Sequence, residues 1–116
     1  MDKTQIKSFS HLVPMIYAYT TPGVPEHDGW TKIGYTAKQT VDDRIKQQTH
    51  TVNVKAHKEW ASEARYTDGS GEYFTDHEFH RYLMVVKHIE RQPKTEWFHI
   101  DGKKSKNYFN QFREGD

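Results

Sequence analysis

The order of apolar and polar residues predicts a strand pair near the start of the chain. Aromatic and β-branched residues alternate with smaller ones over residues 15–19 and again over residues 30–36, as in half-buried strands. The segment between them holds two prolines, two glycines and an aspartate, which favour a turn. The two strands are therefore expected to form an antiparallel hairpin.

The rest of the chain predicts three helices and two further strands. Thr40 is placed to cap a short helix, and Thr75 with Glu78 has the spacing of a capping box. Phe79 and Leu83 belong to the apolar stripe Phe79, Tyr82, Leu83 and Val86 of that second helix. The expected elements are a helix over 41–48, a strand over 52–64, a loop over 66–71, a helix over 74–87, a strand over 96–100 and a helix from residue 105 that packs Tyr108, Phe109 and Phe112 inward.

These elements define one small α+β domain. We expect a central three-stranded antiparallel sheet flanked by helices, with an extra short strand near 96–100. Residues 1–14 are expected to form an N-terminal arm, and residues 15–113 a single domain, because 116 residues leave no room for a second core.

Composition narrows the class of protein. The chain has no cysteine, which excludes disulfides and cysteine-based zinc sites, and no apolar run long enough to span a membrane. Its N-terminus lacks the apolar core of a signal peptide, so a cytoplasmic location is expected. A net charge of +1 does not by itself indicate a nucleic-acid partner.

Several residues are unusual for the elements that hold them. Lys32 and Gly34 lie inside a predicted strand, and a glycine there often marks the close approach of a backbone or a ligand, such as a phosphate. Arg44 borders the buried stripe of its helix, where a guanidinium either grips a phosphate or pairs with Asp43. Asp76 and His80 are one helical turn apart. That histidine is equally well explained as a half-buried residue bonded to a neighbour.

The order of these motifs resembles the GIY-YIG endonuclease superfamily. The resemblance rests on Ile16-Tyr17 and Lys32-Ile33-Gly34, and is closest to a branch whose second motif reads Lys-Ile-Gly-Tyr-Thr. In that branch a helix reading acid-x-x-x-His is followed by Thr-Glu-Trp-Phe, and residues 76–80 and 95–98 match both. Such proteins use a glutamate as the metal ligand, whereas this chain has Asp76, so Glu78 stays a second candidate.

The resemblance implies hydrolysis of DNA with one divalent ion, Mg²⁺ or Mn²⁺. Asp76 would hold the ion and Arg44 the phosphate, while Tyr17, its pKa lowered by Lys32, or Lys32 itself would activate water. His80 would donate a proton or orient the site, with Glu96 as its partner or as an exposed strand carboxylate. The expected DNA contacts, or for the lysines an ordinary solvated surface, are Gly34, Tyr35, Lys103, Lys104, Lys106 and Asn107.

Two further functions compete with an active nuclease. The same fold can serve as a DNA-binding or targeting module that cuts weakly, which the aspartate and the low net charge favour, or as a purely structural interaction domain. The resemblance also implies that the domain is the nuclease module of a larger bacterial helicase or restriction-type protein. An ATPase would then lie elsewhere in the full-length chain, because no P-loop is present. The sequence indicates no oligomeric state.

Overall fold

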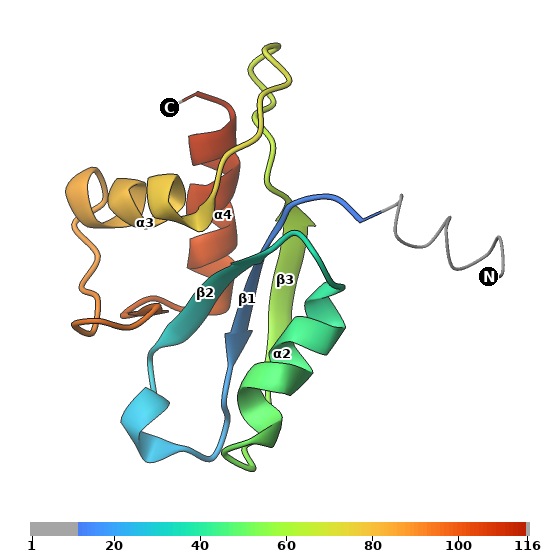
Figure 1. Cartoon of the computed structure of the whole chain (residues 1–116). Coiled ribbons are helices and arrows are strands. Elements are labelled where there is room, and N and C mark those ends of the chain that lie inside the picture. The colour runs from blue at the N-terminus through green and yellow to red at the C-terminus, as the bar shows by residue number, and fades with distance from the viewer. Residues whose placement is uncertain (1–11, 116) are drawn as a thin grey trace, which may run out of the picture.

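The computed structural model describes residues 12–115 and shows an α+β fold with one four-stranded antiparallel sheet (Figure 1). The predicted fold class is confirmed, including the extra short strand. In chain order the elements are β1 (Met15–Thr20), η1 (Pro25–His27), β2 (Thr31–Thr36), α2 (Val41–His50), β3 (His57–Glu63), α3 (Asp76–Val85), β4 (Trp97–Phe98) and α4 (Gly102–Arg113). The predicted arm at 1–14 lies mostly outside the described residues.

The sheet has the strand order β3-β1-β2-β4, so β1 and β2 are its central strands. The pairing of β1 with β2 sets Tyr17 opposite Gly34 and Tyr19 opposite Lys32. On the other side of β2, the short strand β4 pairs Trp97 with Lys32. Lys32 therefore has an aromatic residue beside it on each neighbouring strand.

Alternation along the strands divides the core between two faces of the sheet. On one face Ile16 and Ile33 pack against α3 and α4, with Phe79 and Phe109 among the fully buried rings. On the other face Tyr17, Tyr19, Val41 and Ile45 form a smaller cluster under α2. Figure 1 shows α3 and α4 on one side of the sheet and α2 on the other. Lys32 and Gly34, which flank Ile33, belong to the α2 face.

The helix starts follow capping chemistry. Thr40 accepts a hydrogen bond from the backbone of Asp43 at the start of α2, and the capping box of Thr75 and Glu78 starts α3 as predicted. The last helix begins three residues earlier than expected, because Asp101 accepts a hydrogen bond from the backbone N–H of Lys104 and so caps α4. Phe109 and Phe112 are buried as predicted, and Tyr108 is partly buried.

Other element boundaries were also predicted wrongly. The third strand begins at His57 rather than Val52, because the chain turns after α2 through Asn53, which has a positive φ, and leaves Val52 63% exposed. Helix α2 runs two residues further, to His50. Helix α3 is shorter than 74–87, and Val86, expected in its core stripe, caps the helix end and is 52% exposed.

No helix within residues 12–115 is both long enough and apolar enough to cross a membrane.

Candidate functional site

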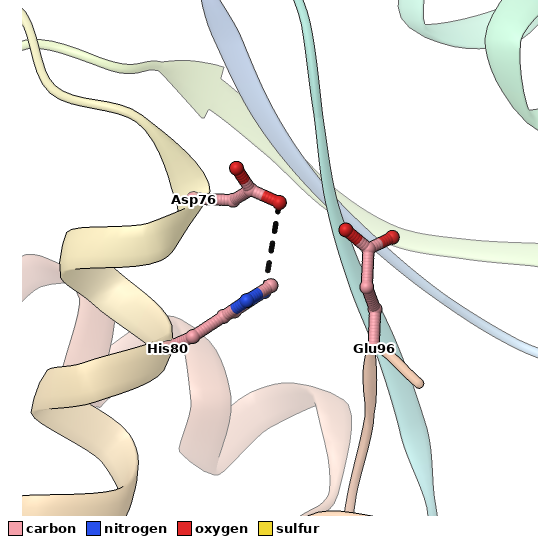
Figure 2. Close-up of side chains that lie close together, drawn as sticks. All are labelled: Asp76, His80 and Glu96. Carbon is pink, nitrogen blue, oxygen red and sulfur yellow. Dashed lines mark ion pairs between the residues drawn. The ribbon is translucent and has the colours of Figure 1, made fainter. Parts of the chain in front are cut away.

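Two carboxylates and a histidine meet beside β2. Asp76 and His80 project from α3, and Glu96 faces them from the residue before β4 (Figure 2). One donor atom from each of the three residues lies within 4.8 Å of those of the other two. Asp76 and His80 are buried, and Glu96 is partly exposed.

The local structure explains why these side chains converge. Asp76 and His80 are four residues apart, so they lie on the same side of α3. The backbone carbonyl of Glu96 accepts a hydrogen bond from the Ile33 amide at 3.0 Å, which ties the residue to β2 just beyond the end of its pairing with β4. Glu96 therefore stands at the edge of the sheet, within reach of both α3 and the α2 face.

The Asp76 and Glu96 carboxyl groups lie close together, with one oxygen of each within 4.8 Å of the other. Burial raises the pKa of the Glu96 carboxyl, and its hydrogen bond with Asp76 raises it further, while the Lys32 ammonium opposes the shift. Lys32 Nζ lies 3.4 Å from Glu96 Oε1. The close pair of carboxyl groups thus has a single lysine as its ion-pair partner among the described residues.

His80 is a neutral side chain held by the sheet. Its Nε2 lies 2.8 Å from the carbonyl oxygen of Ile33, which can only accept, so Nε2 carries the proton. Burial lowers the pKa of His80 to about 4, so the imidazole is uncharged at neutral pH and its 4.0 Å contact with Asp76 is not an ion pair there. Its Nδ1 is buried without a hydrogen-bond partner among the described residues. The bonded, structural interpretation of His80 is therefore supported, and its Nδ1 lone pair remains available.

Glu78, the second candidate for a metal ligand, serves the helix start instead. Its Oε2 accepts hydrogen bonds from the backbone N–H of Thr75 at 2.6 Å and from the Thr75 hydroxyl at 2.8 Å. Partial burial is the largest single influence on the pKa of Glu78 and raises it. The hydrogen bonds with Thr75 act in the opposite direction, and the net pKa is lowered. Asp76 and Glu96 are the carboxylates that face each other at the site.

Tyr17 explains the glycine of the second motif. A Cβ atom at Gly34 would lie 2.9 Å from Tyr17 Cε1 and closer still to its hydroxyl oxygen. The sequence predicted that a backbone or a ligand approaches Gly34. The group that does so is the side chain of Tyr17 on the neighbouring strand. Only glycine leaves room for the phenol at this position.

The phenol of Tyr17 is protonated at neutral pH. Burial raises its pKa, as does the Glu96 carboxylate, whereas Arg44 and a hydrogen bond to Gln48 act in the opposite direction. Lys32 does not lower this pKa as the sequence predicted, because its ammonium is paired with Glu96.

Gln48 and Tyr19 are site residues that the sequence analysis missed. Gln48 Oε1 accepts hydrogen bonds from Tyr17 at 3.1 Å and from Tyr19 at 3.3 Å, and the two rings stack. Helical spacing places Gln48 one turn beyond Arg44, and strand alternation places Tyr19 on the face of Tyr17. Those two periodicities are the signals that could have identified them.

Arg44 lies at the rim of this face. It interacts with the Tyr17 hydroxyl, and its Nη1 donates a hydrogen bond to Gln47 at 3.0 Å. Arg44 and Tyr35 line the same hollow, of about 270 Å³. The predicted catalytic and metal-binding residues thus form one connected set of contacts that extends from the α2 face round the edge of β2. They are Tyr17, Lys32, Arg44, Asp76, His80 and Glu96.

The predicted DNA contacts on α4 do not join this set. Lys103, Lys106 and Asn107 line another hollow together with Glu59 and Trp60 of β3, and Lys106 Nζ lies 5.2 Å from the Trp60 ring. Because β3 and β4 are opposite edges of the sheet, these residues lie at the far side from Glu96. Lys104 is on the same helix, with its Nζ over the ring of Tyr108.

The small α+β fold, with paired carboxylates, a histidine and a lysine at the edge of its sheet, is compatible with a small nuclease-like fold. The family model described as the T5orf172 domain matches residues 15–113. The chain therefore belongs to the T5orf172 domain family, which is associated with GIY-YIG-like nuclease domains and suggests a nuclease-like or DNA-binding module. No curated protein and no solved structure matches the chain significantly.

Proposed function

We propose that this domain is a metal-dependent DNA endonuclease that hydrolyses phosphodiester bonds. The observation that carries the proposal is the meeting of Asp76, His80 and Glu96, with donor atoms within 4.8 Å of one another, beside the ammonium of Lys32. The family match over residues 15–113 is consistent with it.

The residues fit a hard divalent cation such as Mg²⁺ or Mn²⁺. Two carboxylates with oxygens within 4.8 Å of each other repel and are more stable with a cation between them, and oxygen is the ligand such ions prefer. The His80 atom nearest to Asp76 is the protonated Nε2, 4.0 Å from its Oδ2, so His80 would orient the site rather than bind the ion. Asp76 and Glu96 would hold the ion, which, when bound, stabilises negative charge on a phosphate oxygen.

The neighbouring side chains supply the other roles. Arg44 is permanently charged and would bind the phosphate at the rim of the α2 face. Tyr17 is fully buried and its hydroxyl interacts with both Gln48 and Arg44, so it would position the Arg44 guanidinium rather than contact the attacking water. Lys32, whose ammonium is paired with Glu96, would orient the attacking water as a hydrogen-bond donor, and His80 would orient Ile33 and β2 rather than donate a proton, since it is neutral.

DNA would contact two surfaces in this proposal. Tyr35, next to the cluster on β2, shares a hollow with Arg44 and would contact the DNA, whereas Gly34 is buried against the Tyr17 ring and would not. The residues on α4, Lys103, Lys104, Lys106 and Asn107, would bind phosphates further along the duplex, on the β3 side of the sheet.

Nicking of supercoiled plasmid, with and without Mg²⁺ or Mn²⁺, tests the proposal. We expect metal-dependent nicking by the wild-type chain and a loss of at least a hundredfold in Asp76→Asn, since a metal ligand is removed. Asp68→Asn, in a loop away from the cluster, is the matched control and should keep full activity. Nicking that is independent of metal, or equal in the two variants, would reject the proposal.

A DNA-binding module that cuts weakly is the second candidate function. The net charge of +1 and the shorter aspartate at position 76 favour it. Gel-shift binding without nicking, by a chain that also binds Mn²⁺ in calorimetry, would support this alternative. In either case, the module would serve a larger helicase or restriction-type protein, as the sequence resemblance implies.

A further inference from the structure

A second candidate binding site lies beside the short helix η1. A hollow of about 280 Å³ separates the end of β1, the η1 loop and the start of α4. This volume is near the lower end of the range for small-molecule sites. The residues that line the hollow include two aromatic rings and three carboxylates. The rings are His27 and Trp30, and the carboxylates are Asp28, Glu59 and Asp101.

The two rings are held in place from behind. His27 stacks on Trp97 at 3.8 Å between ring centroids, with an angle of 21° between the planes. Its Nδ1 lies 2.7 Å from the hydroxyl of Thr21, which is buried. Trp30 stacks in the same way on His99, at 4.8 Å. Rings fixed in this way lose little conformational freedom when a flat ligand stacks on them.

The hollow is connected to the cluster at the edge of β2 through one residue. Trp97, which supports His27, pairs with Lys32 across β4 and β2. Lys32 Nζ in turn lies 3.4 Å from Glu96. Thr31, the residue before Lys32 in β2, lines the hollow itself, so the hollow and Lys32 are neighbours along this strand.

We propose that this hollow binds an unpaired nucleobase of the DNA substrate, next to the phosphate that is cut. The inference rests on the proposed function and names its substrate class. Aromatic rings stack on any base, and carboxylates accept hydrogen bonds from the N–H groups of a base edge. The same carboxylates repel a phosphate, so the base rather than the backbone enters the hollow.

A base that is paired inside a duplex is not accessible for this contact. The substrate class is therefore DNA that has an unpaired nucleotide at the cleavage point, as at an overhang, a loop or a flap. The lysines on α4 can hold the neighbouring duplex through its phosphates at the same time.

Binding without cleavage tests this inference. Fluorescence anisotropy in EDTA would compare a blunt duplex with the same duplex carrying a short single-stranded tail. We expect the wild-type chain to bind the tailed DNA roughly tenfold more tightly, the contribution of one stacked base. His27→Ala should abolish most of this preference and His27→Phe should retain it, because phenylalanine keeps the ring.

Tyr73→Ala is the matched control. Tyr73 is 49% exposed and belongs to a loop outside the hollow, so its removal should leave the preference unchanged. Equal binding of blunt and tailed DNA by the wild-type chain would overturn the inference, as would equal weakening of both by His27→Ala in a variant that melts normally. Because no metal or cleavage is involved, a preference for tailed DNA without any nicking would refute the proposed nuclease activity alone.

Discussion

The buried imidazole of His80 makes the stability of the fold depend on pH in a calculable way. His80 is 2% exposed, and burial lowers its pKa from 6.5 to about 4. Between these two values the unfolded chain binds a proton at this position and the folded chain does not, so the free energy of unfolding falls as the pH falls through this window.

The size of the effect follows from the two pKa values. Going from pH 7.5 to pH 5, the histidine alone should cost about 2 kcal/mol of stability, since each unit of difference corresponds to about 1.4 kcal/mol. Glu96 acts in the opposite direction, because its raised pKa favours proton binding in the folded state. The contribution of His80 is therefore obtained by comparing two proteins, the wild type and a variant without this histidine. The quantity compared is the change in free energy of unfolding between pH 7.5 and pH 5.

His80→Gln is the suitable variant, because its amide can still donate to the Ile33 carbonyl but does not titrate. Urea unfolding at pH 7.5 and pH 5 should show that the variant loses about 2 kcal/mol less than the wild type. His77→Gln, at an exposed position three residues earlier on the same helix, should lose as much as the wild type. An equal loss in wild type and His80→Gln would refute the reasoning.

Three further predictions concern the site and the helix next to it. Gly34→Ala should destabilise the fold by about 1–3 kcal/mol in urea unfolding, because its methyl group overlaps the Tyr17 ring, and the same substitution made in a Tyr17→Ala chain should cost clearly less. Thr75→Ala should cost about 1 kcal/mol in thermal melting, since it removes the capping box of α3, and an unchanged melting temperature would contradict this role. Glu96→Gln should weaken Mn²⁺ binding in calorimetry roughly tenfold or more, whereas equal affinity would show that Glu96 does not contact the ion.

Local patterns predicted the elements better than their ends. The alternation in β1 and β2 and the capping box of α3 depend on neighbouring residues, and all three are found in the structure. Val52 and Val54 favoured a strand by propensity, but the turn after α2 prevents pairing there. The last helix was expected from residue 105, whereas Asp101 caps a helix that begins at Gly102.

Long-range placement was harder to predict from the sequence. That Asp76 and Glu96 face each other depends on how α3 packs on the sheet and on where β4 pairs, and neither is encoded in local spacing. The partner of Gly34 was predicted as a ligand and is the ring of Tyr17, because strand register decides which residues lie opposite. The position of Lys106 near β3 likewise follows from the packing of α4.

The carboxylate of Glu96 is supported by the shortest strand of the sheet. Strand β4 makes two residue pairs with β2, and one backbone hydrogen bond to Ile33 extends that connection. Short edge pairings open locally far more often than a sheet interior does, and each opening would move the Glu96 carboxylate away from Asp76. An ion bound between Asp76 of α3 and Glu96 would favour the state in which β4 is paired. Ion binding and the pairing of β4 with β2 would then stabilise each other.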